Sequence, residues 1–517
     1  MRKSSTRPAR GTLGQMRRYC PPLTAGLVAL WLYVSTAAPW VSWANDGTDG
    51  GDLIAASMNW GVPHPTGYPT YCLFARLFAL LPLGPIAHRF NLFSATTAAA
   101  AVALVCLSTL RVLRRASGET TWPDAVIGVI CALACAAGPT LWSQATIAEV
   151  YALHCFFFAL CLYLGLRDDL LAQSRYWGAL GLALGLGLGV HLTLLLMLPG
   201  LAILIWQRKT RRHLLALAAG ASAGLAIYVY LPLAARGHPP VNWGNPSSWS
   251  GFWWVLSGKP YQTYAFALPP RHLLSRLSAC ARLLVQQYTL LGVGVGVLGL
   301  CSWIQRGWRN WALATGLTFA VYTIYATLYD TTDSYLYLIP TYLVTALWLA
   351  EGARTVVTGF VRSRPKTRRI GIALGVIVLT AIPVYTALHH HDRLDLSDDR
   401  SAERWTEDVL RQLPEGALLI TSQDRHTFTL DYVQWVEHQR QDLLVIDGDL
   451  LHYDWYIDQI NQRHPSRSAL EQEVSLRQLI SANLGQREVY LVTPRDDLAP
   501  TYQASRHGSL WRITGQN

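Results

Sequence analysis

Charged residues are scarce in this chain: they make up 15% of its 517 residues, whereas hydrophobic residues make up 51%. The mean hydropathy is positive, at +0.21. A water-soluble surface needs more charge than this, so the composition excludes an ordinary soluble enzyme. The 20 Trp and 24 Tyr favour membrane–water interfaces, because each ring can keep one polar edge in water. These features predict a membrane protein.

Two common types of site lack their sequence signals. No pair of the nine cysteines has the spacing of a zinc site or of a disulfide framework, so we interpret the cysteines as small buried apolar residues. The glycine-rich run GLALGLGLGV does not follow a strand, so it is typical of close helix packing rather than of a nucleotide-binding loop.

Lysine is absent after residue 391, where 13 Arg stand against 21 Asp and Glu. Residues 1–391 carry the opposite balance, with 30 basic and 11 acidic residues. The basic residues lie in short clusters between apolar runs, which is the positive-inside pattern of a membrane protein rather than a nucleic-acid-binding surface. We therefore expect membrane lipid, and no nucleic acid, as a partner.

Eleven apolar runs are candidate membrane spans, of which the fifth and sixth are short enough to form one bent helix. They cover residues 23–43, 91–110, 123–141, 148–166, 177–190, 192–206, 213–235, 283–304, 310–328, 335–352 and 370–388. The basic clusters all fall on one side if eleven spans alternate. The predicted fold is an all-α polytopic bundle of about eleven transmembrane helices in the cell (plasma) membrane. It has a cytoplasmic basic N-terminus (1–22), a multi-span domain (23–391) and a small extracytoplasmic α/β domain (392–517).

The C-terminal domain is predicted to be α/β because short apolar strands alternate with helical patterns. The expected strands cover 417–421, 443–447 and 489–493, and the helical patterns surround 431–439 and 455–462. No catalytic constellation is visible in this domain.

Six of the 11 acidic residues before Asp392 lie at the predicted outer ends of spans: Asp46, Asp49, Asp52, Glu149, Asp330 and Asp333. One such residue is more often only part of a polar loop. Six on one face, accompanied by His and Arg, favour a functional site, because carboxylates at a membrane boundary are costly unless they are solvated or paired.

The first outer loop, NDGTDGGDLIAASMNWGVPHPTGYPTY, is the densest of these segments. Asp49 and Asp52 lie three residues apart where a helix is expected to begin, although Asp52 could be only an N-cap. The segment HPTGYP then predicts a rigid turn that carries His64 and Tyr68, followed by an interfacial helix too short to span.

Other polar residues are predicted to share this outer compartment. Glu149 lies at the mouth of spans three and four, and His191 ends the glycine-rich run, where a lone histidine is more often a packing residue. Arg236 begins a long aromatic loop that also holds Asn242 and Trp243. Arginine is suited to bidentate phosphate binding.

Five blocks of this sequence resemble, in order, a family of polytopic membrane proteins of long-unknown function. The family includes the animal transmembrane protein O-mannosyltransferase that acts on receptor IPT domains. The blocks are GDLIAA…GVPHPTGYP, WSQATIAEVYALH, GLGLGVHLTLL, ARGHPPVNWGNP and DYVQWVEHQRQDLLVIDGDLL…WYIDQI. The resemblance covers the chain from about Trp43 to about Ile460. This sequence departs from the family at HPTGYP, where HPPGYP is commoner, and at His154, where Asn is expected.

The resemblance implies the fold of the C-type (GT-C) glycosyltransferases, a polyprenyl-phosphate-sugar donor, and an acidic catalytic base in the first outer loop. By position, Asp49 matches the base and Asp52 the second acid. We assign binding of the donor phosphate and sugar to His64, Tyr68, Glu149, His191, Arg236, Asn242 and Trp243. This chemistry requires no cofactor. The paired acids could still bind a divalent metal ion, so metal binding is left open.

The predicted function is transfer of a sugar, with mannose as the first guess, to a hydroxyl of a protein or glycan acceptor outside the cell. Protein O-mannosylation is one form of this reaction. A transporter or flippase of lipid-linked glycans and a non-catalytic envelope-assembly scaffold are the alternatives. A transporter would show broken helices at the membrane midplane, and a scaffold would tolerate loss of Asp49.

Overall fold

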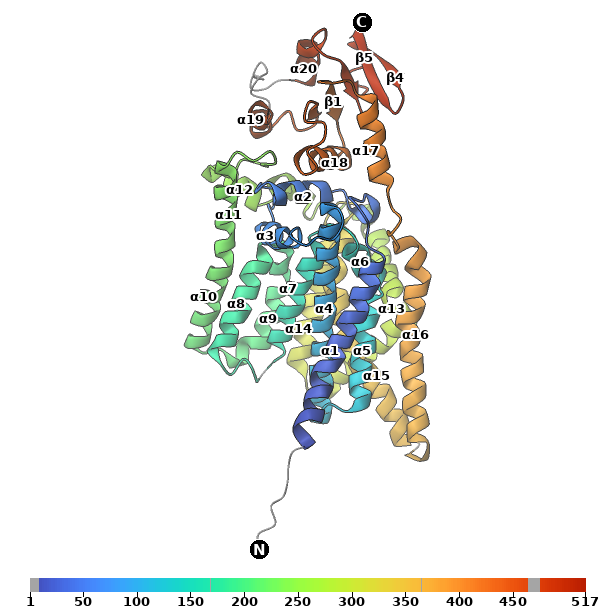
Figure 1. Ribbon diagram of the computed structural model, residues 1–517. Coiled ribbons are helices and arrows are strands. Elements are labelled where there is room, and N and C mark those ends of the chain that lie inside the picture. The colour runs from blue at the N-terminus through green and yellow to red at the C-terminus, as the bar shows by residue number, and fades with distance from the viewer. Residues whose placement is uncertain (1–8, 168, 364, 464–474) are drawn as a thin grey trace.

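The computed structural model describes residues 9–167, 169–363, 365–463 and 475–517. Residues 1–8 of the predicted N-terminal segment and residues 464–474 of the C-terminal domain lie outside this range. Three layers are stacked along one axis (Figure 1): a bundle of long helices, short helices across one end of it, and an α/β domain beyond them.

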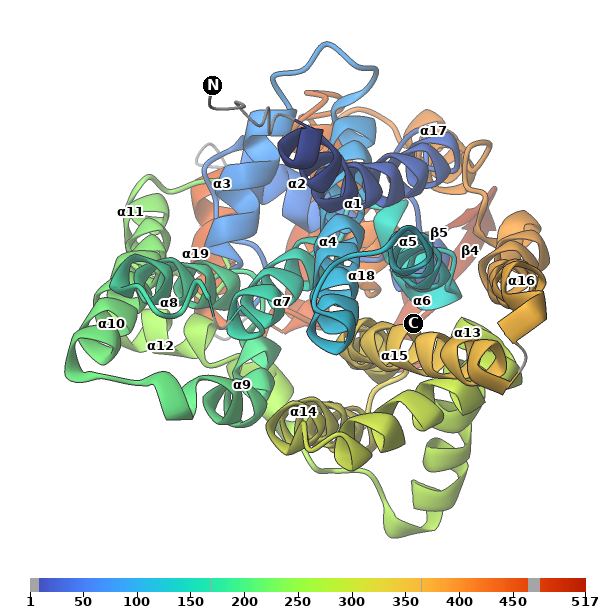
Figure 2. The same ribbon diagram turned by 90° about the horizontal axis from the view of Figure 1, so that it is seen from below.

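Each of the eleven predicted spans lies on a helix of the long layer. In chain order these helices are α1 (Ala9–Ser35), α4 (Ile86–Ser117), α5 (Trp122–Ala136), α7 (Tyr151–Gly165), α8 (Ser174–Leu188), α9 (Leu198–Ile205), α10 (Arg211–Leu225), α13 (Leu273–Gln305), α14 (Arg309–Leu328), α15 (Ile339–Ser363) and α16 (Arg368–Leu394). Viewed along the bundle, α4, α7 and α15 lie inside, while α10 and α16 stand at the edge (Figure 2).

Within the described residues, six helical segments are long and apolar enough to cross a membrane: Ile86–Ser117, Arg211–Arg236, Pro270–Gln305, Arg309–Leu328, Ser334–Ser363 and Arg368–Leu394. Helices α5 and α6 (Pro139–Ala145) meet at a bend of 69° and form a seventh candidate. The other apolar stretches, on α1, α7, α8 and α9, are shorter. Length and composition thus support six or seven spans, and the count of eleven stays a prediction.

The predicted fifth and sixth spans form two helices rather than one bent helix. Helix α8 packs against α10, whereas α9 packs against α14. Gly181 and Gly185 of α8 approach α10 so closely that an added Cβ would lie 2.1 Å from the carbonyl oxygen of Leu217 and 2.5 Å from that of Ala221. The interpretation of the glycine-rich run as a close-packing motif is confirmed.

The middle layer holds α2 (Gly50–Met58), α3 (Pro69–Phe78) and α12 (Trp249–Leu256), whereas α11 (Tyr230–Arg236) continues α10 within the apolar segment Arg211–Arg236. Helices α2 and α3 lie across the ends of the long helices, beneath the C-terminal domain (Figure 1). At 10 residues α3 is too short to cross a membrane, as predicted for the segment after HPTGYP.

The C-terminal domain is built on a five-stranded sheet in the order β2-β1-β3-β5-β4. Strand β1 (Leu418–Thr421) pairs in parallel with β2 (Leu444–Asp447) and β3 (Val489–Leu491), and these are the three predicted strands. The antiparallel hairpin β4 (Tyr502–His507) and β5 (Leu510–Gln516) was not predicted, because β4 is polar and almost wholly exposed. The helices are α17 (Ser401–Gln412), α18 (Asp424–Trp435), α19 (Asp454–Arg463) and α20 (Leu476–Asn483).

Helix α18 docks on α2 with backbone contact. A Cβ at Gly51 would lie 2.2 Å from the carbonyl oxygen of Phe428, so position 51 has no room for a side chain. The indole of Trp43 donates a hydrogen bond to Thr429 (2.9 Å), and Asn59 donates one to the carbonyl of Trp435 (3.0 Å). The C-terminal domain is thereby fixed over the first outer loop.

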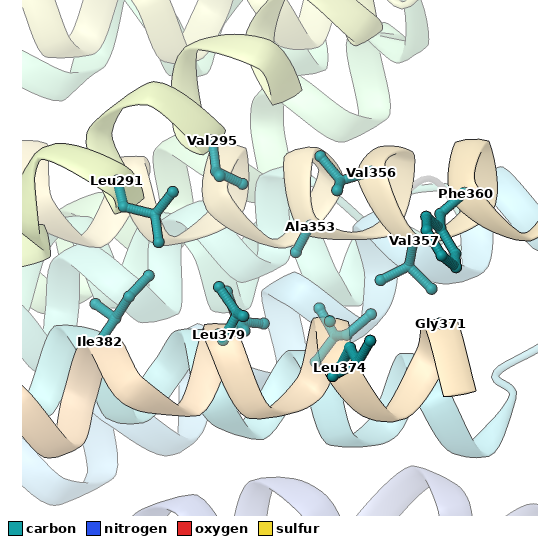
Figure 3. Close-up of a pocket in the computed structure, with 13 residues that line it drawn as sticks. Leu291, Val295, Ala353, Val356, Val357, Phe360, Gly371, Leu374, Leu379 and Ile382 are labelled. Carbon is teal, nitrogen blue, oxygen red and sulfur yellow. The ribbon is translucent and has the colours of Figure 1, made fainter. Parts of the chain in front are cut away.

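All nine cysteines are free thiols, and six of them are buried as expected. Cys280 is partly buried, and the expectation of burial is wrong for Cys20 and Cys301, which are exposed. A hollow of about 250 Å³ between α13, α15 and α16 is lined by apolar residues such as Leu291, Phe360 and Leu374 (Figure 3). The described residues that line it are all apolar or glycine.

Candidate active site

A cavity of about 630 Å³ lies where the long helices, the outer loops and the C-terminal domain meet. Its lining residues are Asp46, Thr48, Asp49, His64, Pro65, Thr66, Tyr68, Tyr151, His191, Leu192, Thr193, Leu195, Leu196, Ser257, Gly258, Tyr261, Gln262, Tyr264, Ala265, Tyr325, Tyr329, Thr331, Thr332, Asp333, Tyr337 and Asp424. Segments from most of the chain therefore contribute to one chamber.

Asp49 immediately precedes α2, and its carboxylate lines the cavity. One third of its side chain is exposed, and the hydroxyl of Thr48 donates a hydrogen bond to Oδ1 (3.2 Å). Its second oxygen, Oδ2, lies 3.4 Å from Nε2 of His64. A carboxylate held in this way is accessible to a ligand and fixed in direction.

Asp52 has a different position from Asp49. It is fully buried in the first turn of α2 and does not line the cavity. Its Oδ2 accepts hydrogen bonds from the backbone N–H of His64 (2.9 Å) and from Nδ1 of His64 (2.7 Å), and its Oδ1 accepts one from the indole of Trp243 (3.0 Å). The alternative of Asp52 as a plain N-cap is wrong, because Asp49 occupies the cap position. Asp52 instead orients the His64 ring toward Asp49.

This arrangement determines the charge of His64. Burial alone lowers the pKa of an imidazole, but the carboxylates of Asp49 and Asp52 outweigh burial and raise the pKa of His64 to about 9. Burial is also the main cause that raises the pKa of Asp49 above its usual range; the charge of His64 opposes this effect. At neutral pH the site therefore holds an imidazolium between two carboxyl groups.

Seven tyrosines line the same cavity: Tyr68, Tyr151, Tyr261, Tyr264, Tyr325, Tyr329 and Tyr337. The ring of His191 lies against three of them, with centroid distances of 6.4 Å to Tyr68, 5.6 Å to Tyr151 and 5.7 Å to Tyr337. Aromatic rings and hydroxyl groups together can stack on a sugar and hydrogen-bond to it.

Four of the nine predicted site residues line the cavity: Asp49, His64, Tyr68 and His191. Glu149 is 3% exposed and lies outside the lining, where its Oε2 accepts a hydrogen bond from the N–H of Val150. Asn242 and Trp243 belong to a loop that pairs through its backbone with Val62. They therefore pack against the first outer loop and do not line the cavity. Arg236 is exposed at the end of α11 and does not reach the cavity. Asp52, the ninth predicted residue, is buried beside His64 and does not line the cavity.

Sequence reasoning missed the cavity-lining tyrosines other than Tyr68, and it missed Asp424 of the C-terminal domain. The high tyrosine content was interpreted only as typical of a membrane–water interface, and it did not indicate which tyrosines line a site. Asp46 and Asp333 were noted as outer acids and do line the cavity, and Asp46 accepts a hydrogen bond from the hydroxyl of Tyr335 (2.7 Å). No group of three or more metal-binding side chains in suitable geometry occurs in the described part of the chain.

The whole architecture is similar to that of solved structures of ArnT from Cupriavidus metallidurans. The apo structure has a TM-score of 0.59 with 14% identity, covering 95% of this chain and 96% of that one. The structure bound to undecaprenyl phosphate has a TM-score of 0.56, also with 14% identity, and covers 98% of each chain. The fold of this chain is therefore similar to that of the two ArnT structures.

The family resemblance is confirmed by direct matches. The model of the protein O-mannosyl-transferase TMEM260 N-terminal domain matches residues 49–214, and the model of TMEM260-associated domain 2 matches residues 402–506. The mouse protein O-mannosyl-transferase TMEM260 is 24% identical over 444 residues, which are 81% of this chain. The match spans 62% of the mouse protein.

Proposed function

We propose that this chain is a membrane glycosyltransferase that moves mannose from a polyprenyl-phosphate donor to a protein hydroxyl on the extracytoplasmic side. The observation that carries the proposal is the carboxylate of Asp49, which lines a large cavity and is held by His64. The name of the mouse relative supports mannose and a protein acceptor, and the lipid phosphate bound by ArnT supports the donor class.

The proposed mechanism is a single displacement at the anomeric carbon. Asp49 takes the proton of the acceptor hydroxyl while that oxygen forms the new bond to C1 of the sugar. The bond between C1 and the phosphate oxygen breaks, and the electron pair leaves with the polyprenyl phosphate. The His64 imidazolium, His191 and the tyrosine hydroxyls are the lining groups that can stabilise this phosphate. No step requires a metal.

The donor also accounts for the apolar part of the lining. Leu192, Leu195 and Leu196 lie at the start of the segment that leads into α9, next to His191. A polyprenyl chain remains in the hydrocarbon layer, so the donor is expected to enter along this apolar wall with its phosphate toward His191.

A panel of labelled polyprenyl-phosphate sugars tests this function. We expect the purified protein to transfer label from the mannose donor to a hydroxyl-bearing peptide and to be thermally stabilised by that donor. A protein that neither turns over nor is stabilised by any donor of the panel would contradict the proposal.

The pH profile of transfer should have two limbs. Activity should fall in acid as Asp49 becomes protonated, at a pH above the usual range of an aspartate because its pKa is raised. Activity should also fall as the pH rises through about 9, because His64 then loses the proton that makes it a phosphate-binding cation. His64→Gln should lower activity and remove the alkaline limb. A His64→Gln enzyme that kept the same alkaline limb would exclude His64 as its origin.

We also propose that the N-terminus is cytoplasmic and that the domain after residue 391 is extracytoplasmic, as the one-sided basic clusters predict. A reporter enzyme that works only outside the cytoplasm, fused after Asn517, should be active, and one that works only in the cytoplasm should be inactive. The opposite pattern would contradict this topology.

A further inference from the structure

The C-terminal domain contributes a residue, Asp424, to the lining of the cavity. Asp424, the first residue of α18, is a lining residue together with Asp49. Four residues later, the ring of Phe428 stacks on that of His64 at a centroid distance of 6.2 Å and an interplanar angle of 11°. The backbone contact at Gly51 fixes the position of α18. The placement of Asp424 is therefore determined by the same packing that surrounds His64.

The cavity has two chemically different walls. The wall at Leu192, Leu195 and Leu196 is apolar and continues into the long-helix layer, where a polyprenyl chain belongs. The wall at Asp424 belongs to a domain outside that layer (Figure 1). A donor that enters from the first wall leaves the second wall to the acceptor.

The charges of the lining residues are unbalanced. Four carboxyl groups line the cavity, those of Asp46, Asp49, Asp333 and Asp424. Among the described residues that line it, the basic side chains are two histidines, and there is no Lys or Arg. If the donor phosphate lies against the two histidines, as the proposed mechanism has it, the lining groups left to an acceptor are carboxylates and tyrosine hydroxyls. A second anion at this position would be repelled.

We propose that Asp424 binds the acceptor, and that the acceptor is a neutral or positively charged protein segment that carries a hydroxyl group. This inference rests on the proposed function, and it adds a residue of the C-terminal domain and a charge class for the acceptor. It excludes acidic segments and phosphate-bearing glycans as good substrates.

Two threonine peptides of equal length, one flanked by lysine and one by glutamate, test this inference with the full chain and a labelled polyprenyl-phosphate mannose. We expect the wild type to prefer the lysine-flanked peptide in kcat/KM, mainly through a lower KM. Burial, together with the charge of Asp49, raises the pKa of Asp424 to about 7, so the comparison is made at pH 8, where its carboxyl is mostly ionised. There Asp424→Lys should reduce the preference ratio by about tenfold, because it replaces attraction by repulsion. Asp424→Asn should reduce it less.

Asp408→Lys is the matched control, because Asp408 is exposed on α17 of the same domain, outside the cavity, where it accepts a hydrogen bond from Gln412 (2.7 Å). It should leave the ratio unchanged. A wild-type preference for the glutamate-flanked peptide, or an equal ratio in wild type and Asp424→Lys, would overturn the inference even if transfer itself occurs.

Fluorescence anisotropy of the labelled peptides gives a second readout that does not depend on turnover. If no donor is turned over, the proposed function fails. Binding of the lysine-flanked peptide that weakens in Asp424→Lys but not in Asp408→Lys would then still support the acceptor wall. Equal binding of both peptides by wild type and both variants would overturn it.

Discussion

Asp49→Asn is expected to lower the turnover of sugar transfer by about 10²–10⁴-fold, because asparagine keeps the shape of the side chain but cannot accept the acceptor's proton. Donor affinity should change little, since the carboxylate acts on the acceptor. The measurement is single-turnover transfer from labelled polyprenyl-phosphate mannose, alongside a separate measurement of donor-induced thermal stabilisation.

Asp330→Asn is a suitable control, because Asp330 is another outer acid but is not a lining residue of the cavity. It should transfer at nearly the wild-type rate. If Asp49→Asn stayed near normal while Asp52→Asn or Glu149→Gln abolished transfer, the base would be misassigned. If all three variants kept full activity, the glycosyltransferase proposal itself would fall.

Asp52→Ala is expected to destabilise the protein by about 3–5 kcal/mol, because it leaves the buried His64 imidazolium without its main hydrogen-bond partner. Asp52 accepts two hydrogen bonds from His64 and one from Trp243, all within the buried packing of the first outer loop. The pKa of His64 should then fall from about 9, so the alkaline limb of the activity profile should move to lower pH.

Thermal unfolding in detergent measures the loss of stability, and the double variant Asp52→Ala/His64→Ala separates its causes. Removing both partners should recover part of the stability, because the unpaired charge is gone. Asp52→Asn should be milder, since its amide oxygen can still accept a hydrogen bond. A loss below about 1 kcal/mol in Asp52→Ala would show that the charge on His64 is solvated rather than held by Asp52.

For the two acids of the first outer loop, Asp49 and Asp52, the sequence predicted that they belong to the site but not which of them faces the cavity. The spacing and the family block brought attention to both Asp49 and Asp52, and both lie beside His64. Which of them faces the cavity could not be read from the spacing, because it depends on the packing of His64 and Trp243 around the start of α2. Trp243 is 191 residues away from Asp52 in the chain.

The positions of Arg236 and Asp424 also depend on tertiary packing. Arg236 was predicted to be a site residue and lies away from the cavity, whereas Asp424 was not predicted and lines it. Arg236 had the best side chain for a phosphate, yet α11 ends in a way that leaves it exposed and away from the cavity. Asp424 had no motif around it, and it reaches the cavity only because α18 packs on α2 at Gly51. Such contacts between distant segments leave no local pattern in the sequence.

The sequence by itself determined that the protein is a polytopic membrane protein, where its apolar helices lie, and that three buried strands form part of the C-terminal sheet. Hydropathy and periodicity are properties of residues that are neighbours in the sequence, so they can be recognised without knowledge of the fold. The tertiary structure decided which acids share the cavity, that seven tyrosines line it, and that the C-terminal domain contributes Asp424 to its lining. These features depend on close packing between helices far apart in the chain, such as the contact between Gly51 and Phe428.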